Sequence, residues 1–317
     1  MSATSPTDAL SYYSQPIIKE PVWEADIPLY FFTGGLAGAS DLLALGAQFS
    51  GNRRLRTSAL AAATFGTAVS PYFLIKDLGR PLRFLNMLRV VKVTSPMSVG
   101  TWIFSAESAT TSVAAACRLF GVFPRVRAMA QVLAGLIGPA QATYTGALVA
   151  QSVVPAWHEA RRELPLLFAS SAAASAGAAA AILTPVEQAA PARRLGIIGG
   201  ATELATSKLM EKRLGKLIGS VYHEGEAGKY SRFATASTLA GTALMAVAGK
   251  RRVGAVAAGA LLLTGSLCER FAVYHAGKQS ARDPHHTSIP QKERGGRAVT
   301  QPSSRTGNGS SPSASTR

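Results

Sequence analysis

The chain has 317 residues and a formal net charge of +16, yet only 16% of its residues are charged and 47% are hydrophobic. A soluble globular protein carries about 25% charged residues, and a nucleic-acid-binding protein would spread its Lys and Arg over a water-facing surface. Here the basic residues interrupt long apolar runs, as they do in membrane proteins with positively charged cytoplasmic loops. The composition therefore predicts an integral membrane protein that contacts the lipid bilayer and does not bind nucleic acid.

The composition divides the chain into three parts. Residues 1–22 form a polar tail whose prolines disfavour a helix. Residues 23–277 form one predicted membrane domain and leave no room for a soluble catalytic domain. Residues 278–317 are rich in Ser, Pro, Gly, Arg and Thr. Because that composition cannot bury a hydrophobic core, we expect a disordered basic tail.

The membrane domain contains eight runs, each close to the about 20 residues that cross a hydrocarbon core. They are residues 27–48, 57–76, 98–119, 127–150, 164–184, 195–213, 231–249 and 252–274. Five are clear from hydropathy, whereas the fifth, sixth and seventh are rich in Ala, Gly and Ser. Small residues suit either close packing in a membrane or a soluble Ala-rich helix. Beside five clear spans we favour the membrane, and the predicted fold is an all-α integral membrane protein with eight transmembrane helices.

The loops suggest an orientation. Those after the first, third, fifth and seventh runs are short, basic and almost free of acidic residues, whereas the N-terminal tail has a single Lys. The positive-inside rule then places the protein in the cell membrane with its N-terminus outside, although the loop between the second and third runs and the C-terminal tail are also basic and argue against this. The longer loops share the N-terminal face, where they form either a docking surface or merely solvated connections.

The residues of a metal-centred redox protein are missing. No His lies in the middle of a run, although a haem in a helical bundle needs axial ligands there, usually His. Cys117 and Cys268 stand alone, with no series of cysteines for an iron–sulfur cluster. We expect no haem, cluster or metal site in this chain, so any redox metal belongs to a partner.

Asp41, Glu107, Glu203 and Lys208 are ionisable residues inside the runs. Such residues are costly in a membrane and are therefore functional candidates. We consider them proton-path candidates, with an ordinary hydrogen bond between helices as the alternative for each. Glu203 and Lys208, five residues apart, are expected to face one interior cavity.

Tyr144 lies on a helical stripe with Gln141, Leu148 and Gln151. A tyrosine on such a stripe either contacts a ligand or simply packs between helices, and the spacing alone leaves both possibilities open.

Three stretches carry a family resemblance: WEADIPLYFFTGGLAGAS, DLGRPLRFLNMLRVVKVTSPMSVGTW and TYTGALVAQSVVPAWHEARRELPLLF. Together with the eight runs they resemble the polysulfide reductase membrane subunit family, also called NrfD-like, over most of residues 12–284. The stretches SYYSQPIIKEPVW and SARDP are similar to the type found beside formate dehydrogenase-like molybdoenzymes in actinobacteria.

The resemblance implies two four-helix bundles and a quinone or quinol pocket near the outer face, with menaquinone as the expected quinone. It also implies a ferredoxin-like iron–sulfur partner docked over that pocket and a molybdopterin catalytic subunit beyond it. The chain itself would have no catalytic residue. The alternatives are a structural anchor without quinone chemistry and a small-solute or proton transporter, for which Gly138-Pro139 would be a helix break.

The resemblance also implies site residues. Tyr144, in the YTG motif, matches a family tyrosine implicated in quinone contact. Trp23, Asp26 and Tyr30 lie where the family places its other quinone contacts. We add His158 as a proton-handling candidate on the same face.

The loop between the second and third runs is the expected partner-docking loop. A Ser followed by Pro is also typical of a helix start, which predicts that Ser95 and Pro96 begin the third helix. Asp77, Arg80 and Pro81 would fix the turn that leaves the second. The full set comprises Asp77, Arg80, Pro81, Arg83, Asn86, Ser95 and Pro96.

Overall fold

A computed structural model describes residues 17–80 and 82–284, apart from the side chain of Lys216. Within these ranges the chain is helical and contains no strand, which confirms the all-α prediction. Each predicted run lies in one long helix, apart from the last residue of the fifth and seventh runs: α1 (Asp26–Phe49), α2 (Arg53–Asp77), α4 (Pro96–Leu119), α5 (Pro124–Ala150), α7 (Leu164–Leu183), α8 (Ala190–Gly219), α9 (Gly225–Ala248) and α10 (Arg252–Arg282). The short elements are α3 (Arg83–Leu88), α6 (Pro155–Glu159) and the 3-10 turn η3 (Ser220–Tyr222).

Five described helices are long and apolar enough to cross a membrane: α1, α2, α5, α7 and α10. The hydropathy of two helices differs from the prediction. The fifth run, predicted to be weak, lies in α7, which is the most apolar of the five because Ala and Leu dominate it. The third run, predicted to be clear, lies in α4, which is not among them because Ser and Thr dilute its apolar residues. The apolar helices support a membrane protein.

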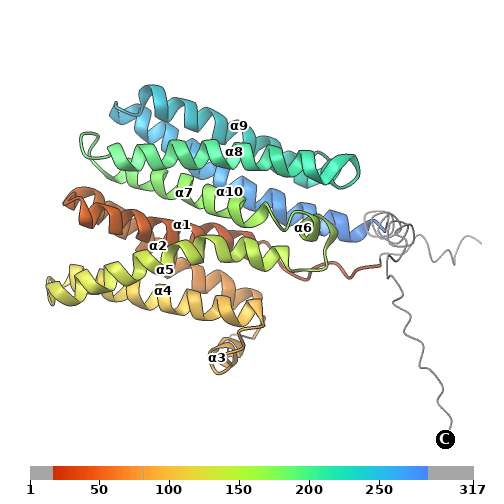
Figure 1. Cartoon of the computed structure of the whole chain (residues 1–317), viewed down its shortest axis with the longest axis horizontal. Helices are drawn as coiled ribbons and strands as arrows, with labels where there is room; N and C mark the ends of the chain where they lie inside the picture. The colour runs from red at the N-terminus through yellow and green to blue at the C-terminus, as the bar shows by residue number, and fades with distance from the viewer. Residues whose placement is uncertain (1–16, 81, 285–317) are drawn as a thin grey trace, which may run out of the picture.

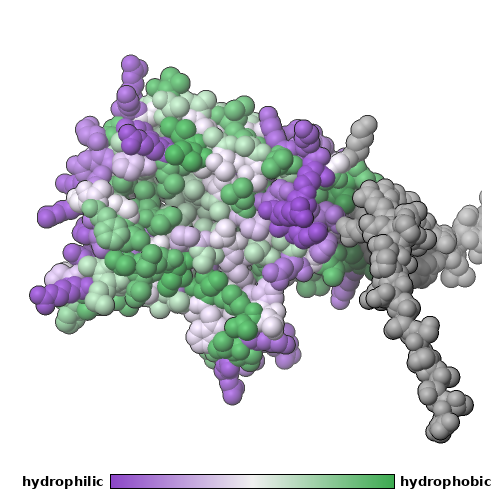
Figure 2. All heavy atoms as spheres, in the orientation of Figure 1, coloured by the Kyte–Doolittle hydropathy of each residue, from purple (hydrophilic) through white to green (hydrophobic). Residues whose placement is uncertain are grey.

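The long helices lie alongside one another (Figure 1). α1 packs along α2 and α5, and α4 packs along α5. α7 packs along α8 and α10, and α9 packs along α10. We call α1, α2, α4 and α5 the first group of helices and α7, α8, α9 and α10 the second group. Contacts of α1 and α5 with α7 join the two groups. On the face drawn in Figure 2, hydrophilic side chains gather towards the two ends of the helices and hydrophobic ones lie between them, as expected for a protein that crosses a bilayer.

The closest approach between α1 and α5 depends on two glycines. A Cβ on Gly38 would lie 2.3 Å from the carbonyl oxygen of Gly138, and a Cβ on Gly138 would lie 2.2 Å from the carbonyl oxygen of Gly38. Small residues allow this backbone contact, as they do in many membrane bundles. Pro139 lies inside α5, which continues past it to Ala150. The Gly138-Pro139 pair is therefore not a helix break.

Two helices extend beyond the predicted runs. α10 continues to Arg282, past residue 277, where the prediction ended the membrane domain. α8 continues to Gly219 across a kink at Gly215, whose φ of 69° favours glycine. Most of the predicted polar tails, residues 1–16 and 285–317, lie outside the described residues.

Candidate functional site

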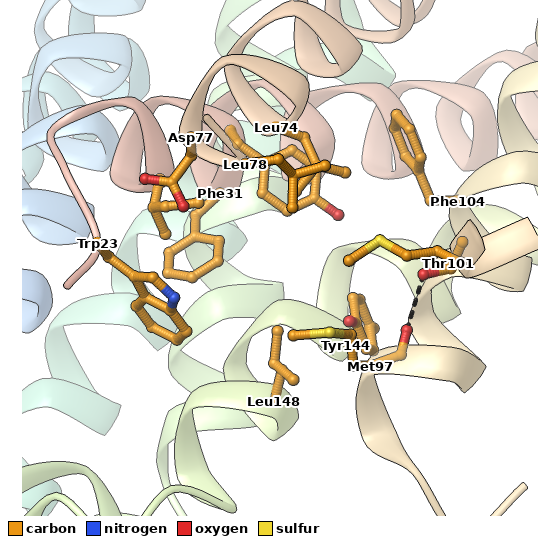
Figure 3. Close-up of a pocket in the computed structure, with 13 residues that line it drawn as sticks. Trp23, Phe31, Leu74, Asp77, Leu78, Met97, Thr101, Phe104, Tyr144 and Leu148 are labelled. Atoms are coloured by element: carbon orange, nitrogen blue, oxygen red, sulfur yellow. Dashed lines mark hydrogen bonds between the residues drawn. The ribbon is translucent and has the colours of Figure 1, made fainter. Parts of the chain in front are cut away.

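A cavity of about 100 Å³ lies among the ends of α1, α2, α4 and α5, beside α3 (Figure 3). Its walls are aromatic and apolar, with hydroxyl groups and one carboxylate among them. The lining residues are Trp23, Ile27, Tyr30, Phe31, Leu74, Asp77, Leu78, Met87, Met97, Thr101, Phe104, Tyr144 and Leu148. The lining residues thus come from the segment before α1, from four long helices and from the loop between α2 and α4.

Aromatic contacts hold one wall of the cavity. The ring of Trp23 stands edge-on to Phe31 at a centroid distance of 6.2 Å, and Tyr30 meets Phe104 in the same way at 5.7 Å. Behind the wall, Trp23 stacks on Trp157 of α6 at 5.4 Å. Edge-to-face and offset-stacked pairs of this kind favour fixed ring positions, so the wall is largely pre-formed.

Tyr144 lies where α5 meets α4. A Cβ built on Gly100 of α4 would lie 1.6 Å from Cζ of Tyr144, so the tyrosine ring occupies the space beside this glycine. Next to it, Thr101 donates a hydrogen bond of 2.9 Å to the carbonyl oxygen of Met97, drawn as the dashed line in Figure 3. Gly100 therefore sets how closely Tyr144 approaches α4.

Two of the expected quinone contacts lie outside the lining. Asp26 is buried and forms an ion pair with Lys76 at 3.0 Å. His158 is half-buried on α6. Its neighbour Trp157 is the residue of this stretch that reaches the cavity wall, and its Nε1 donates to the carbonyl oxygen of Val273 at 2.7 Å. Sequence reasoning missed Trp157, although a Trp in the same PAWHE stretch was a usable signal.

The loop between α2 and α4 ends as expected, at Ser95 and Pro96. α4 starts at Pro96, and the Ser95 side chain caps it by accepting a hydrogen bond from the Ser98 amide at 3.4 Å. Asp77 is the last residue of α2, and Gly79, with φ of 66°, makes the following turn. Asp77 also lines the cavity. The sequence predicted it only as a residue of the partner-docking loop.

The middle of this loop is the short helix α3, which was not predicted. None of its residues is buried, and the side chains of Arg80, Arg83 and Asn86 are exposed. Pro81 lies outside the described residues.

Asp41 and Glu107 belong to one buried polar cluster inside the first group of helices. Thr111 of α4 donates a hydrogen bond to Asp41 of α1, and Gln131 of α5 lies 3.5 Å from the same carboxylate. Thr67 of α2 lies 3.5 Å from Glu107 of α4, with Thr67 as the donor. Four helices therefore contribute to this cluster.

Glu203 and Lys208 do not face one interior. Glu203 is buried and accepts a hydrogen bond from Thr238 of α9 at 3.1 Å, whereas Lys208 is exposed. The expectation was wrong because five residues on an α-helix rotate the side chain about 140° from the first.

The second group of helices holds a charge that sequence reasoning missed. Arg270 of α10 is buried, donates to the carbonyl oxygen of Phe168 at 2.8 Å and lies 3.9 Å from the centroid of the Phe168 ring. Glu269 beside it is also buried. The signal was the charged pair in the stretch CERF, inside the otherwise apolar final run.

The comparison with known families gives one match. The family described as Polysulphide reductase, NrfD matches residues 15–193, which is more than half of the chain. The chain belongs to the NrfD family. No curated protein matches it at a significant level. Membership suggests that the chain is a membrane subunit of a molybdopterin oxidoreductase.

The NrfD match contains every residue that lines the cavity, since these lie between Trp23 and Leu148. Most of α8 and all of α9 and α10 lie beyond it. The residues that the structure describes contain no group of three His, Cys, Asp or Glu side chains able to hold a metal ion. The cavity is therefore the part of this NrfD protein in which binding of a family ligand should be tested.

Proposed function

We propose that this NrfD protein is the membrane anchor and quinone-interacting subunit of a multi-subunit molybdopterin oxidoreductase. It exchanges electrons between the quinone pool of the membrane and an iron–sulfur partner subunit. The observation that carries this proposal is the cavity between Trp23 and Tyr144, which lies within the matched part of the chain. The narrower type, associated with formate dehydrogenase-like enzymes, is proposed from the resemblance alone.

The lining fits a quinone head group chemically. The two carbonyl oxygens of such a ring accept hydrogen bonds, and the ring prefers aromatic or apolar walls. Tyr30 and Tyr144 supply hydroxyl donors, while Trp23 and Phe104 supply aromatic walls. A bound quinone, expected to be menaquinone, supplies two-electron and two-proton redox chemistry. The tyrosines would orient its carbonyl groups and the walls would exclude water.

The cavity must enlarge before it can admit a quinone ring. Its volume of about 100 Å³ is smaller than the roughly 150 Å³ of an apolar cavity that binds benzene. Met87 and Met97 line the side next to α3, and Met97 is about half exposed. Because methionine side chains adapt easily, we propose that these two move to admit the ring.

The rest of the assembly follows the same proposal. The helices would form two bundles of four transmembrane helices, as their mutual contacts suggest, with the N-terminus outside the cell membrane. A ferredoxin-like subunit would dock at the cavity end of the bundle, where Arg80, Arg83 and Asn86 are exposed, with the molybdopterin subunit beyond it. Asp41 and Glu107 stay proton-path candidates, and we expect no complete proton pump, because no predicted run carries a close series of acidic residues.

The first test is metal content after gentle purification of a tagged chain from its native membranes. Iron together with molybdenum or tungsten in fixed ratio to the chain is the expected result, and formate is the first electron donor to assay. A chain that purifies without metal and without other subunits would overturn the proposed assembly and favour a transporter. The uninterrupted α5 already weighs against the broken helices typical of transporters.

A second test separates the quinone-interacting subunit from a structural anchor. Tyr144→Ala removes one of the two proposed hydroxyl donors of the cavity, and we expect the complex to assemble but to lose quinone-linked activity. Tyr72→Ala is the matched control, because Tyr72 is 63% exposed and does not line the cavity. An anchor would keep its activity in both variants.

A further inference from the structure

The wall of the cavity that contains Trp23 lies on a segment without helix. Residues 19–24 precede α1 and adopt no regular structure, so no helical hydrogen bonds fix the position of this indole. Since Trp23 lines the cavity, its position depends on contacts from outside the segment. We therefore asked which residues make those contacts.

One peptide group of the segment is held from both sides. The carbonyl oxygen of Trp23 accepts hydrogen bonds from the Tyr274 hydroxyl at 2.5 Å and from Nζ of Lys278 at 3.4 Å, both on α10. The amide N–H of Glu24, which belongs to the same peptide group, donates to Asp77 at the end of α2 at 3.1 Å. In a planar trans peptide the carbonyl and the N–H point in opposite directions. The group therefore bridges α10 and α2.

Ion pairs hold the beginning of the segment on α10 as well. Arg282 donates to both carboxylate oxygens of Glu20, at 2.8 and 2.9 Å, and Lys278 lies 3.3 Å from the same carboxylate. Lys278 also lies 3.3 Å from the Tyr274 hydroxyl, within hydrogen-bond distance. Because a bidentate Arg–carboxylate pair has a defined geometry, the end of α10 orients the segment as well as attracting it.

The same helix supports the indole from behind. Trp157, on which Trp23 stacks, donates its Nε1–H to the carbonyl oxygen of Val273. Gly277, one turn further along α10, makes room for it, since a Cβ there would lie 2.0 Å from the Trp157 ring. Backbone and ring of Trp23 are thus both held by residues 273–282.

We propose that Tyr274 and Lys278 of α10 are positioning residues for the cavity, which fix the Trp23 wall from the second group of helices. Neither residue lines the cavity, and both lie beyond residue 193, where the family match ends. The inference rests on the proposed function, because positioning the wall matters only if a quinone ring binds against it. Removing the Tyr274 hydroxyl leaves the Trp23 carbonyl with only the longer hydrogen bond from Lys278 and loosens the wall without altering any lining residue.

The experiment is a titration of the purified full-length chain, with any subunits that accompany it, with menadione, a naphthoquinone without a tail. All proteins carry Trp102→Phe, so that Trp23 and Trp157 are the tryptophans that remain in this chain, and the quinone-dependent quenching of tryptophan fluorescence gives Kd. We expect Tyr274→Phe to raise Kd about 2- to 10-fold, the range for losing one hydrogen bond. Lys278→Met, which keeps the Lys stem, should raise it less. In quinone-linked turnover the KM for quinone should rise while kcat is kept.

Tyr230→Phe is the matched control, since Tyr230 stacks on His275 of α10 but does not touch the segment. An unchanged Kd in Tyr274→Phe, with the parent protein binding menadione, would overturn the inference and leave the proposed function standing. Equal losses in Tyr274→Phe and Tyr230→Phe would also overturn it, because they would indicate a general loosening of α10. A parent protein that shows no quenching would overturn the proposed function itself. If Tyr274→Phe cannot be purified, Lys278→Met decides alone by the same criterion.

Discussion

The ring of Tyr144 fills the space beside the backbone of Gly100, so that a Cβ on Gly100 would lie 2.0 Å from the tyrosine Oη. The Tyr144 hydroxyl can therefore keep its place in the cavity only while residue 100 has no side chain. This pair of residues links packing between α4 and α5 to the chemistry proposed for the cavity.

Gly100→Ala should displace Tyr144 and strongly reduce quinone-linked activity. The reason is steric, because contacts of 1.6 to 2.0 Å to two ring carbons and the hydroxyl oxygen of Tyr144 require the whole side chain to move. Activity of the purified complex with a soluble quinone analogue is the measurement, with complex assembly checked by metal content. Gly46→Ala is the control, because a Cβ there meets nothing within 4 Å, and Ala stabilises a helix by up to about 1 kcal/mol over Gly. Full activity in Gly100→Ala would show that the cavity does not depend on this contact.

Gly138→Ala should destabilise the bundle without replacing any residue that lines the cavity. The new methyl group would meet the carbonyl oxygen of Gly38 at 2.2 Å, so α1 and α5 must separate. Overpacking of this kind costs about 1–3 kcal/mol, which should lower the midpoint of thermal unfolding in detergent. Gly46→Ala again serves as the control. An unchanged midpoint would mean that the two helices are not in backbone contact.

The sequence predicted the helices well because runs of about 20 apolar residues have few other uses. The helix ends were also predictable where the sequence contains a capping pattern, as at Ser95 and Pro96. The start of α8 at Ala190 was not predicted, because it lies before the apolar run and its first five residues include Pro191 and two arginines.

The candidate site was predictable only in part. Trp23, Tyr30 and Tyr144 line one cavity, as the resemblance implied that they belong together. The ion pair between Asp26 and Lys76 could not be predicted, because it depends on how two neighbouring helices are rotated. The angle between Glu203 and Lys208, in contrast, follows from helix geometry alone and should have excluded a shared interior.

The ion pair between Glu20 and Arg282 predicts a pH dependence. The Arg282 guanidinium, with help from Lys278, holds the pKa of Glu20 below its usual value of 4.5. The stabilisation is therefore present above that pH and is lost as the pH falls through the lower, folded-state pKa. Glu20→Gln should lower the unfolding free energy at neutral pH by less than about 1 kcal/mol, since the pair is partly exposed. The difference from the parent protein should vanish in acid, and a difference that persists there would rule out this cause.

Glu203→Gln should leave both turnover and proton uptake per electron unchanged. Glu203 lies in the second group of helices, in contact with Thr238, whereas the cavity and the Asp41 cluster lie in the first. The substitution is close to isosteric. The oxygen that accepts from Thr238 can remain, and among the described residues the other carboxylate oxygen has no hydrogen-bond partner that an amide would lose.

The measurement is proton uptake during quinone-linked turnover in sealed vesicles, with Glu187→Gln, an exposed residue, as the control. If Glu203→Gln keeps turnover but abolishes the proton gradient, then the second group of helices carries a proton path of its own. In that case the buried neighbours Glu269 and Arg270 would be the next residues to replace, because they lie on α10, which packs against α8.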